Sequence, residues 1–368
     1  MNTMPKQRIT VSLANVLLIV ATGLLLVLLW QLQSLLVALM IAVVVAATLA
    51  PIIDRAQKQQ IPRWLAVIVV YLGLMAILTG AGLLIGPTVV QQIERLIQRL
   101  PTYLEILRSL TEKLAIRLGM SDPNSISSIS QLFDTQSLTG WVIRTSQQLL
   151  VRSYDVTIGI LGGFLTLLLA LLLSAYLLSG SENLIKGLVS LFPKPWDERL
   201  EAQVRPVSQR MGGYIQGRVL VSGILGIAIT IGLTFLGLSE FAVGLGVIAG
   251  FTNLIPFLGP ILGAIPALIV AIASGGWTFL WVLLLFLMIQ SVETYLLDPL
   301  LVGTSVNVHP LYQLLAVLGG TQVLGIVGAL IVPPWVAGAA VLLENLYLKP
   351  KRLAEQAEVS APLATVNI

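Results

Sequence analysis

The feature that most constrains this 368-residue chain is a series of eight long apolar stretches. They cover residues 11–30, 32–53, 64–87, 156–178, 219–238, 241–273, 277–297 and 308–348. About 20 apolar residues in a helix cross the hydrocarbon layer of a membrane. Only 10% of the residues are charged, against about 25% in soluble domains, so a compact soluble body of this size would lack polar surface. The sequence predicts an all-α, polytopic helical membrane protein with about eight transmembrane segments.

The positive charges indicate how the chain threads the membrane. If each stretch crosses once, 14 of the 21 Lys and Arg residues fall on one side, Arg218 among them as a loop charge, and the other seven lie in the long segment 88–155. Short cytoplasmic loops carry such an excess of positive charge, whereas long segments are exempt from this rule. Both termini are therefore expected in the cytoplasm. The stretch 11–30 is too long for a signal-peptide core and reads as a retained first span.

The same pattern divides the chain into six parts. Residues 1–87 should form three transmembrane helices, and 88–155 an extramembrane group of amphipathic helices that Pro101 interrupts. The fourth transmembrane helix follows at 156–178, a cytoplasmic amphipathic linker at 179–217, the C-terminal transmembrane core at 218–348 and a cytoplasmic tail at 349–368. The segment 88–155 could serve as a cap, an interface or a gate.

Two stretches are too long for one crossing. Residues 241–273 would extend about 50 Å as a straight helix and 308–348 about 60 Å, whereas the hydrocarbon layer is about 30 Å thick. Both are rich in Gly and Pro, which predicts a half-helix or re-entrant turn plus a full span in each. Broken backbone at membrane depth survives only beside protein or a watery cavity, where transporters bind solutes. The alternative is that glycines merely allow close packing and prolines merely kink the helices.

Polar residues inside these stretches are the candidate site residues, because ionisable groups in a membrane are costly. They are Glu293, Asp298 and His309, which we expect to meet the break formed by Asn253, Pro256, Gly259 and Pro260. Glu293 could bind a cation or relay a proton. Alternatively, Glu293 and Asp298 mark the hydrated outer end of their stretch, and His309 is a hydrogen-bonded structural residue.

The chain lacks the residues that several kinds of metal-binding and catalytic site require. There is no cysteine and only one histidine, which leaves no basis for a thiolate or typical zinc site, so no metal or other cofactor is expected. No phosphate-binding Gly-x-x-x-x-Gly-Lys-Ser/Thr motif and no activated nucleophile is visible. We expect neither an enzyme nor an ATP-driven pump, and the small positive net charge reflects membrane orientation rather than a nucleic-acid partner.

Three sequence stretches resemble one known family. They read MGGYIQGRVLVSGILGI, AGFTNLIPFLGPILGAIPA and LDPLLVGTSVNVHPLYQLLAVLGGTQVLGIVGALIVP. Their order, spacing and apolar context resemble the autoinducer-2 exporter family of bacterial, PerM-like permeases. Besides Asn253, Pro256, Gly259, Pro260 and His309, the signature positions are Tyr214, Gly217, Pro299, Gly303, Pro310, Gly325, Gly328 and Pro333. The chain departs from the family pattern at Arg218, where Gln is common, and at Thr304, where a basic residue is common.

The resemblance implies a multi-pass, homo-oligomeric permease of the bacterial inner membrane. Members of the family are associated with export of signal molecules in quorum sensing and with sodium/proton exchange. We therefore expect a secondary transporter that exports a small polar metabolite of the autoinducer-2 type, with Glu293 binding the coupling H⁺ or Na⁺. An Na⁺(Li⁺)/H⁺ antiporter is the alternative, and a non-transporting membrane scaffold is an alternative of another class.

Overall fold

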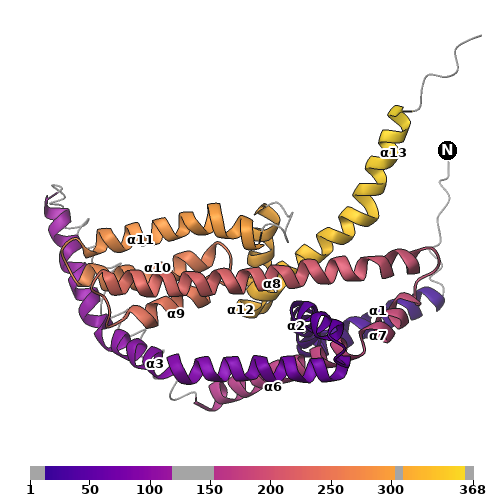
Figure 1. The fold of residues 1–368 in the computed structure, drawn as a ribbon, viewed down its shortest axis with the longest axis horizontal. Coiled ribbons are helices and arrows are strands. Elements are labelled where there is room, and N and C mark those ends of the chain that lie inside the picture. Colours follow the sequence, from indigo (N-terminus) through magenta and orange to yellow (C-terminus); the bar gives the residue numbers. More distant parts are fainter. Residues whose placement is uncertain (1–12, 118–152, 303–309, 361–368) are drawn as a thin grey trace, which may run out of the picture.

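The computed structural model describes residues 13–117, 153–302 and 310–360, and in these ranges the chain is helical without a β-strand (Figure 1). The N-terminal helices are α1 (Leu13–Gln31), α2 (Gln33–Lys58), α3 (Arg63–Arg117), α6 (Ser153–Ser179) and α7 (Ser181–Val189). The others are α8 (Trp196–Phe235), α9 (Ala242–Thr252), α10 (Leu258–Ala273), α11 (Thr278–Val292), the π-helix η1 (Glu293–Val302), α12 (Pro310–Leu343), the π-helix η3 (Glu344–Leu348) and α13 (Lys349–Ser360).

The predicted all-α, polytopic membrane fold is confirmed, although the number of crossings is not. Within the described ranges, five helical segments are long and apolar enough to cross a membrane: 33–58, 63–110, 196–235, 278–302 and 310–356. A sixth is obtained if Leu165–Ser179 and Ser181–Val189, which are bent by 85° relative to each other, count as one broken span. The predicted count of eight stays a prediction.

Helix α3 contradicts the expectation that Pro101 ends a helical run. The helix continues through Pro87 and Pro101 for 55 residues, about 80 Å. Contacts on both sides of Pro101 hold the backbone there: Arg99 forms an ion pair with Glu240, and Tyr103 packs against the buried cluster of α8–α11. Such contacts offset the hydrogen bond that a proline removes from a helix. The far half of α3 therefore curves around the ends of α9–α11 (Figure 1).

Helix α8 joins two parts of the chain that the sequence analysis kept separate. It runs without interruption from Trp196 to Phe235, through the boundary predicted at residue 217. Asp197 and Glu198 lie in its first turn, where negative charge is favourable beside the helix N-terminus. It ends before Gly237, whose φ of 83° reverses the chain. Arg218, counted among the cytoplasmic loop charges, instead lies inside this helix, where it is buried.

The first over-long stretch is a helical hairpin. Helix α9 runs antiparallel to α8, with Gly246 against Thr230 and Gly250 against Ser222. Helix α10 turns back along α9, because Gly263 contacts Ala249. With 11 and 16 residues, neither helix reaches the roughly 20 residues of a crossing, so the expected full span is absent and two short helices replace it.

Close backbone approach explains the glycines of this hairpin. A Cβ atom on Gly246 would collide with Thr230 Oγ1, and one on Gly250 would lie 2.9 Å from the Ser222 carbonyl oxygen.

The turn at residues 253–257 contains Phe257 at φ 65° and ψ −46°, with Leu258 N–H bonded to the Pro256 carbonyl oxygen at 2.8 Å. This is a classic γ-turn, a rare and strained conformation. The hairpin thus begins and ends at one end of α8, and its tip lies partway along that helix.

The second over-long stretch also folds back on itself, as the expected re-entrant break requires. Gly325 interrupts α12 at φ 63° and ψ −146°, and Gly320 lies against Gly328, where any side chain would collide with the opposite backbone. Both ends of α12 approach the same part of α8, since Gln313 Nε2 donates to the Tyr214 hydroxyl at 3.3 Å and Gly338 contacts Met211. The glycines allow close packing and also create the break.

Candidate transport site

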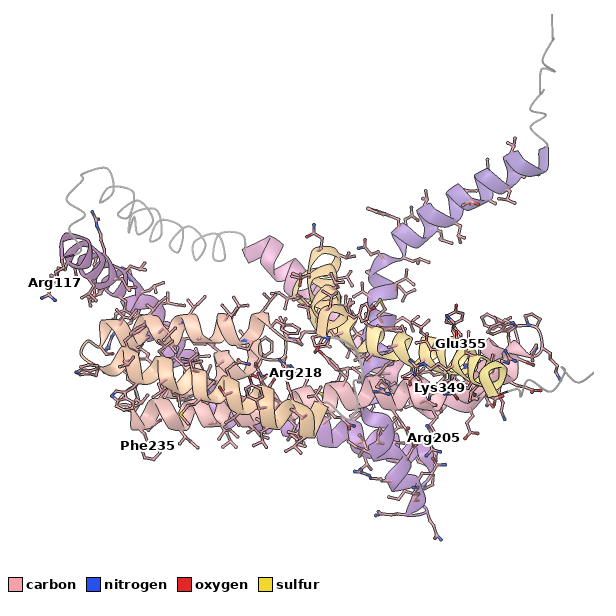
Figure 2. All side chains as sticks on the ribbon, turned by 90° about the horizontal axis from the view of Figure 1, so that it is seen from above. Arg117, Arg205, Arg218, Phe235, Lys349 and Glu355 are labelled. Carbon is pink, nitrogen blue, oxygen red and sulfur yellow. The ribbon has the colours of Figure 1, made fainter. Side chains whose placement is uncertain are left out.

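A buried cluster of charged side chains lies where α8 meets η1. Arg218 Nη1 is 3.1 Å from Glu293 Oε1 and 3.3 Å from Asp298 Oδ1. The side chains of Arg218 and Glu293 are 5% and 3% exposed, whereas that of Asp298 is 41% exposed. Figure 2 places Arg218 about midway along the molecule, between the bundle that ends at Phe235 and the crossing helices. One guanidinium therefore pairs with a buried and a half-exposed carboxylate together.

The tip of the α9–α10 hairpin completes the cluster. Asn253, which is 3% exposed, donates a hydrogen bond from Nδ2 to Glu293 Oε1 at 3.0 Å. Its backbone N–H bonds to the Ala249 carbonyl oxygen, so the amide side chain is fixed at the end of α9. Glu293 Oε1 thus accepts from both Arg218 and Asn253, which ties the hairpin tip to η1 and α8.

The π-helical turn explains how two carboxylates reach one arginine. Glu293 and Asp298 are five residues apart, a spacing that places side chains on different faces of an α-helix. In a π-helix, hydrogen bonds join residues five apart, so both carboxylates lie on one face. Such turns occur frequently at functional sites. Pro299 lies in the same helix, where its missing N–H removes one bond of the α-helical ladder.

Burying these charged side chains, fully or in part, lowers stability unless each charge has a partner. Burying an ion pair requires desolvation of both groups, and a charge left alone in the interior destabilises a protein strongly. With both carboxylates ionised the cluster carries one net negative charge. Ionisable groups inside a membrane mark ion or solute pathways by default. The cluster is therefore the candidate functional site, and a proton or cation can neutralise its excess charge.

A small pocket adjoins the cluster on the side of the hairpin. Its polar lining consists of Asn253, Gln290 and Glu293, and Pro260 lies at the tip. Apolar side chains of α8, α9 and α11 form the remaining walls: Leu225, Ile229, Ala249, Phe286 and Ile289. The space inside suits a water molecule or a bare ion rather than a metabolite. A larger solute would require the hairpin tip to move.

The structure brings together five of the predicted site residues. Asn253, Pro260, Glu293 and Asp298 lie in the cluster or its pocket, and Pro256 belongs to the hairpin turn. Gly259 packs directly against the backbone of Thr252, a structural role in holding the tip. His309 and the signature residue Gly303 lie outside the described residues.

The remaining signature residues shape the surrounding helices. Tyr214 is buried one turn before Arg218, and Gly217 lets η1 approach, since a side chain there would collide with the Leu301 carbonyl oxygen. The others shape η1 or α12: Pro299, Pro310, Gly325, Gly328 and Pro333. Opposite the hairpin tip, α8 and η1 form the wall of the site, and the described part of α12 contacts α8 at Tyr214 and Met211.

Arg218 is the site residue that sequence reasoning missed. It was interpreted as a cytoplasmic charge and as a departure from the family pattern. Its neighbours provided a signal, because it stands in the apolar context GRVLVSG, and Glu293 and Asp298 in a distant apolar stretch had no basic partner. A charge in a membrane requires a partner, so pairing these residues was open to prediction. Ser222, one turn further along α8, was also missed.

The fold and the buried cluster define a multi-pass helical membrane protein with an ionisable site inside its apolar core. A family sequence profile described as AI-2E family transporter matches residues 17–348. The chain belongs to this family of transporters, and the resemblance found from the sequence motifs is confirmed.

Curated relatives agree with this assignment. YueF and YrrI of Bacillus subtilis (strain 168) are both 27% identical to the chain, over 286 and 315 residues. The alignments cover 76% of this chain and 76% of YueF, and 84% of this chain and 86% of YrrI. PerM of Escherichia coli (strain K12) is 27% identical over 290 residues, 78% of this chain and 80% of PerM. Their names refer to transport or to a permease and specify no solute, which supports a role in membrane transport.

Proposed function

We propose that this protein is a secondary transporter of the bacterial inner membrane that exports a small polar metabolite of the autoinducer-2 type. The observation that carries the proposal is the position of Glu293. This carboxylate is buried, pairs with Arg218 and accepts a hydrogen bond from Asn253 at the hairpin tip. A carboxylate that joins the hairpin tip to a charged centre can couple the binding of an ion to movement of that tip.

The proposed coupling follows from the loss of one negative charge. Ionised Glu293 holds Arg218 and the hairpin tip together. When Glu293 gains a proton, its attraction for both donors falls, while Asp298 still neutralises Arg218. The tip can then separate from η1 and open the adjacent pocket to solute. A ligand shifts such an equilibrium by its different affinity for the two states, so a proton gradient can drive solute movement.

We further propose that both termini face the cytoplasm and that the functional unit is a homo-oligomer in the lipid bilayer. The basic residues Lys349, Lys351 and Arg352 at the end of the last apolar segment support the orientation. Wide apolar surfaces on α1 and α3 support contact with lipid or with further copies, since many of their large side chains are exposed.

An Na⁺(Li⁺)/H⁺ antiporter is a second candidate, favoured by the pocket beside Glu293. One carboxylate and the amides of Asn253 and Gln290 line a space of ionic size. Hard cations prefer oxygen ligands of this kind. In this case the ion itself is the cargo, and no movement of a metabolite is needed.

Flux through the purified protein in proteoliposomes separates these candidates. Labelled autoinducer-2 and ²²Na⁺ are followed under an imposed proton gradient, with wild type, Glu293→Gln and the matched control Glu344→Gln. Glu344 is also a carboxylate in a π-helix, but it lies at the end of α12 beside Lys349. Solute movement without sodium supports the exporter, and sodium–proton exchange supports the antiporter. If the folded protein moves neither autoinducer-2 nor sodium, both transport candidates are contradicted and a non-transporting scaffold is favoured.

A further inference from the structure

Two buried polar atoms in the cluster have no hydrogen-bond partner among the residues that the structure describes. They are Arg218 Nε and Ser222 Oγ, and both residues are 4% exposed. A donor buried without a partner lowers stability, because it gave up its hydrogen bonds to water. Native proteins rarely leave such groups unmatched, and the exceptions tend to have functional reasons.

The two atoms belong to one face of α8. Arg218 and Ser222 are four residues apart, so their side chains are neighbours on the helix surface. Both contacts of Arg218 with carboxylates use Nη1, which leaves the Nε–H edge of the guanidinium unused. Leu225 and Ile229, on the following turns of α8, line the pocket that also contains Glu293. The unmatched donors therefore belong to the turn of α8 that runs from the ion cluster to the first residue of this helix that lines the pocket, Leu225.

We infer that Arg218 Nε and Ser222 Oγ form a pair of donors that binds an oxygen atom of the transported solute, and that this solute is uncharged. The inference rests on the proposed transport function and specifies how the same site recognises its cargo. A hydroxyl or carbonyl oxygen can accept from both donors. With Glu293 protonated, Asp298 already neutralises Arg218, so a buried anion would have no uncompensated positive charge to pair with, which opposes its binding. The site thus selects a neutral solute rich in hydroxyl or carbonyl groups.

Two substitutions remove the donors while leaving the charges. Ser222→Ala deletes the hydroxyl, and Arg218→Lys keeps a positive charge for Glu293 and Asp298 but has no Nε–H edge. Ser274→Ala is the matched control, because Ser274 Oγ bonds to the Val270 carbonyl oxygen on α10, away from the cluster. The probes are the labelled four-carbon polyol erythritol and its carboxylate counterpart erythronate, followed by counterflow exchange in proteoliposomes.

We expect saturable exchange of erythritol by wild type and much weaker exchange of erythronate. Loss of one neutral hydrogen bond in Ser222→Ala should raise the half-saturation concentration for erythritol about two- to tenfold. Arg218→Lys should raise it further, and Ser274→Ala should leave it unchanged. Preferred exchange of erythronate, no saturable exchange of erythritol, or the same half-saturation concentration in Ser222→Ala and wild type would each overturn the inference.

The outcome is separable from that of the proposed coupling. Ser222→Ala should keep the dependence of erythritol flux on the proton gradient, because Glu293 remains in place. Erythritol exchange that is sensitive to Ser222→Ala but never responds to a gradient would contradict the coupling and support the donor pair. Gradient-driven flux that is insensitive to Ser222→Ala would support the coupling and contradict the donor pair.

Discussion

Two arginines show how the two halves of this molecule differ. Arg63 begins α3 and joins helix ends: its Nε donates to the Leu178 carbonyl oxygen at 2.6 Å, and its Nη2 donates to Ser181 Oγ at 3.1 Å. Its side chain is 24% exposed, against 5% for Arg218. Arg218 lies within a helix and pairs with two carboxylates. The first arginine secures a joint between helices near polar surroundings, whereas the second holds charge inside an apolar core.

Packing follows the same division. The most hydrophobic part of α3 has no buried residue, and large side chains of α1 and α3 such as Leu24 and Leu84 are exposed, as suits a surface in lipid. In α8 and α9, by contrast, glycines bring backbones into direct contact. Small residues at helix interfaces permit such close approach in membranes. The comparison indicates that the N-terminal helices form a scaffold, and that the tightly packed C-terminal helices hold the site.

The largest effect on stability should come from removing the buried cation. Arg218→Leu leaves Glu293 uncompensated in the core, which should lower the free energy of unfolding by about 3–5 kcal/mol. Thermal unfolding of the detergent-solubilised protein measures the loss. The double variant Arg218→Leu, Glu293→Leu should recover much of it, because apolar pairs replace buried ion pairs well. Equal melting temperatures for the single variant and wild type would contradict the burial of this charge.

Close packing of α8 and α9 gives the next prediction. In Gly246→Val the new side chain collides with Thr230 Oγ1, so the two helices must separate, at a cost of about 1–3 kcal/mol. Melting temperature and solute flux should both fall. Gly223→Val, also on a membrane helix, is the control, because in the described part of the chain no neighbouring atom lies within 4 Å of a Cβ at that position. If both variants had the same melting temperature and flux, close packing at Gly246 would not be what holds α8 against α9.

A smaller loss of stability is expected from a substitution in the N-terminal half. Arg63→Gln shortens the side chain that bonds to the Leu178 carbonyl oxygen, which should cost about 1–2 kcal/mol without changing the gradient dependence of transport. Arg55→Gln, an exposed arginine near the end of α2, serves as the control for charge alone. Loss of gradient dependence in Arg63→Gln would show that the two halves do not differ in role.

The smallest effect should follow from loosening the exposed contact between α3 and the α8–α9 connection. Glu240→Gln weakens ion pairs with Arg99 at 2.8 Å and Arg95 at 3.9 Å, all at side chains that are well exposed. Exposed pairs contribute about 0–1 kcal/mol and are screened by salt. The change in melting temperature should therefore be slight and should vanish at high salt. A large, salt-independent change would indicate a buried role for Glu240.

Much of the fold was predictable because apolar length and Gly/Pro content act locally. The breaks near Pro256 and Gly325 appear where those residues stand, and the helical class follows from the apolar stretches. The continuity of α3 through Pro101 was not predictable, because distant contacts of Arg99 and Tyr103 stabilise it. Nor could composition separate one long span from a hairpin of two short helices, which is what residues 241–273 form.

The carboxylates and the amide of the candidate site were predictable from the sequence. Glu293, Asp298 and Asn253 stood out as polar groups in apolar sequence. In the structure Arg218 joins the two carboxylates, and Asn253 bonds to Glu293. Arg218 itself was assigned to a loop, because charge counting along the chain treats every arginine near an apolar boundary as a surface charge. The pairing of α8 with η1 is a tertiary contact between residues 75 positions apart, which no local pattern reports.

The central claim is that Glu293 couples ion binding to solute movement. Its most direct test compares two fluxes of labelled autoinducer-2 through Glu293→Gln in proteoliposomes: counterflow exchange without a gradient, and net flux under an imposed proton gradient. The account predicts that exchange persists while the gradient no longer drives net flux, because glutamine keeps the polar contacts but binds no proton. Net flux that still follows the gradient as in wild type would contradict the account.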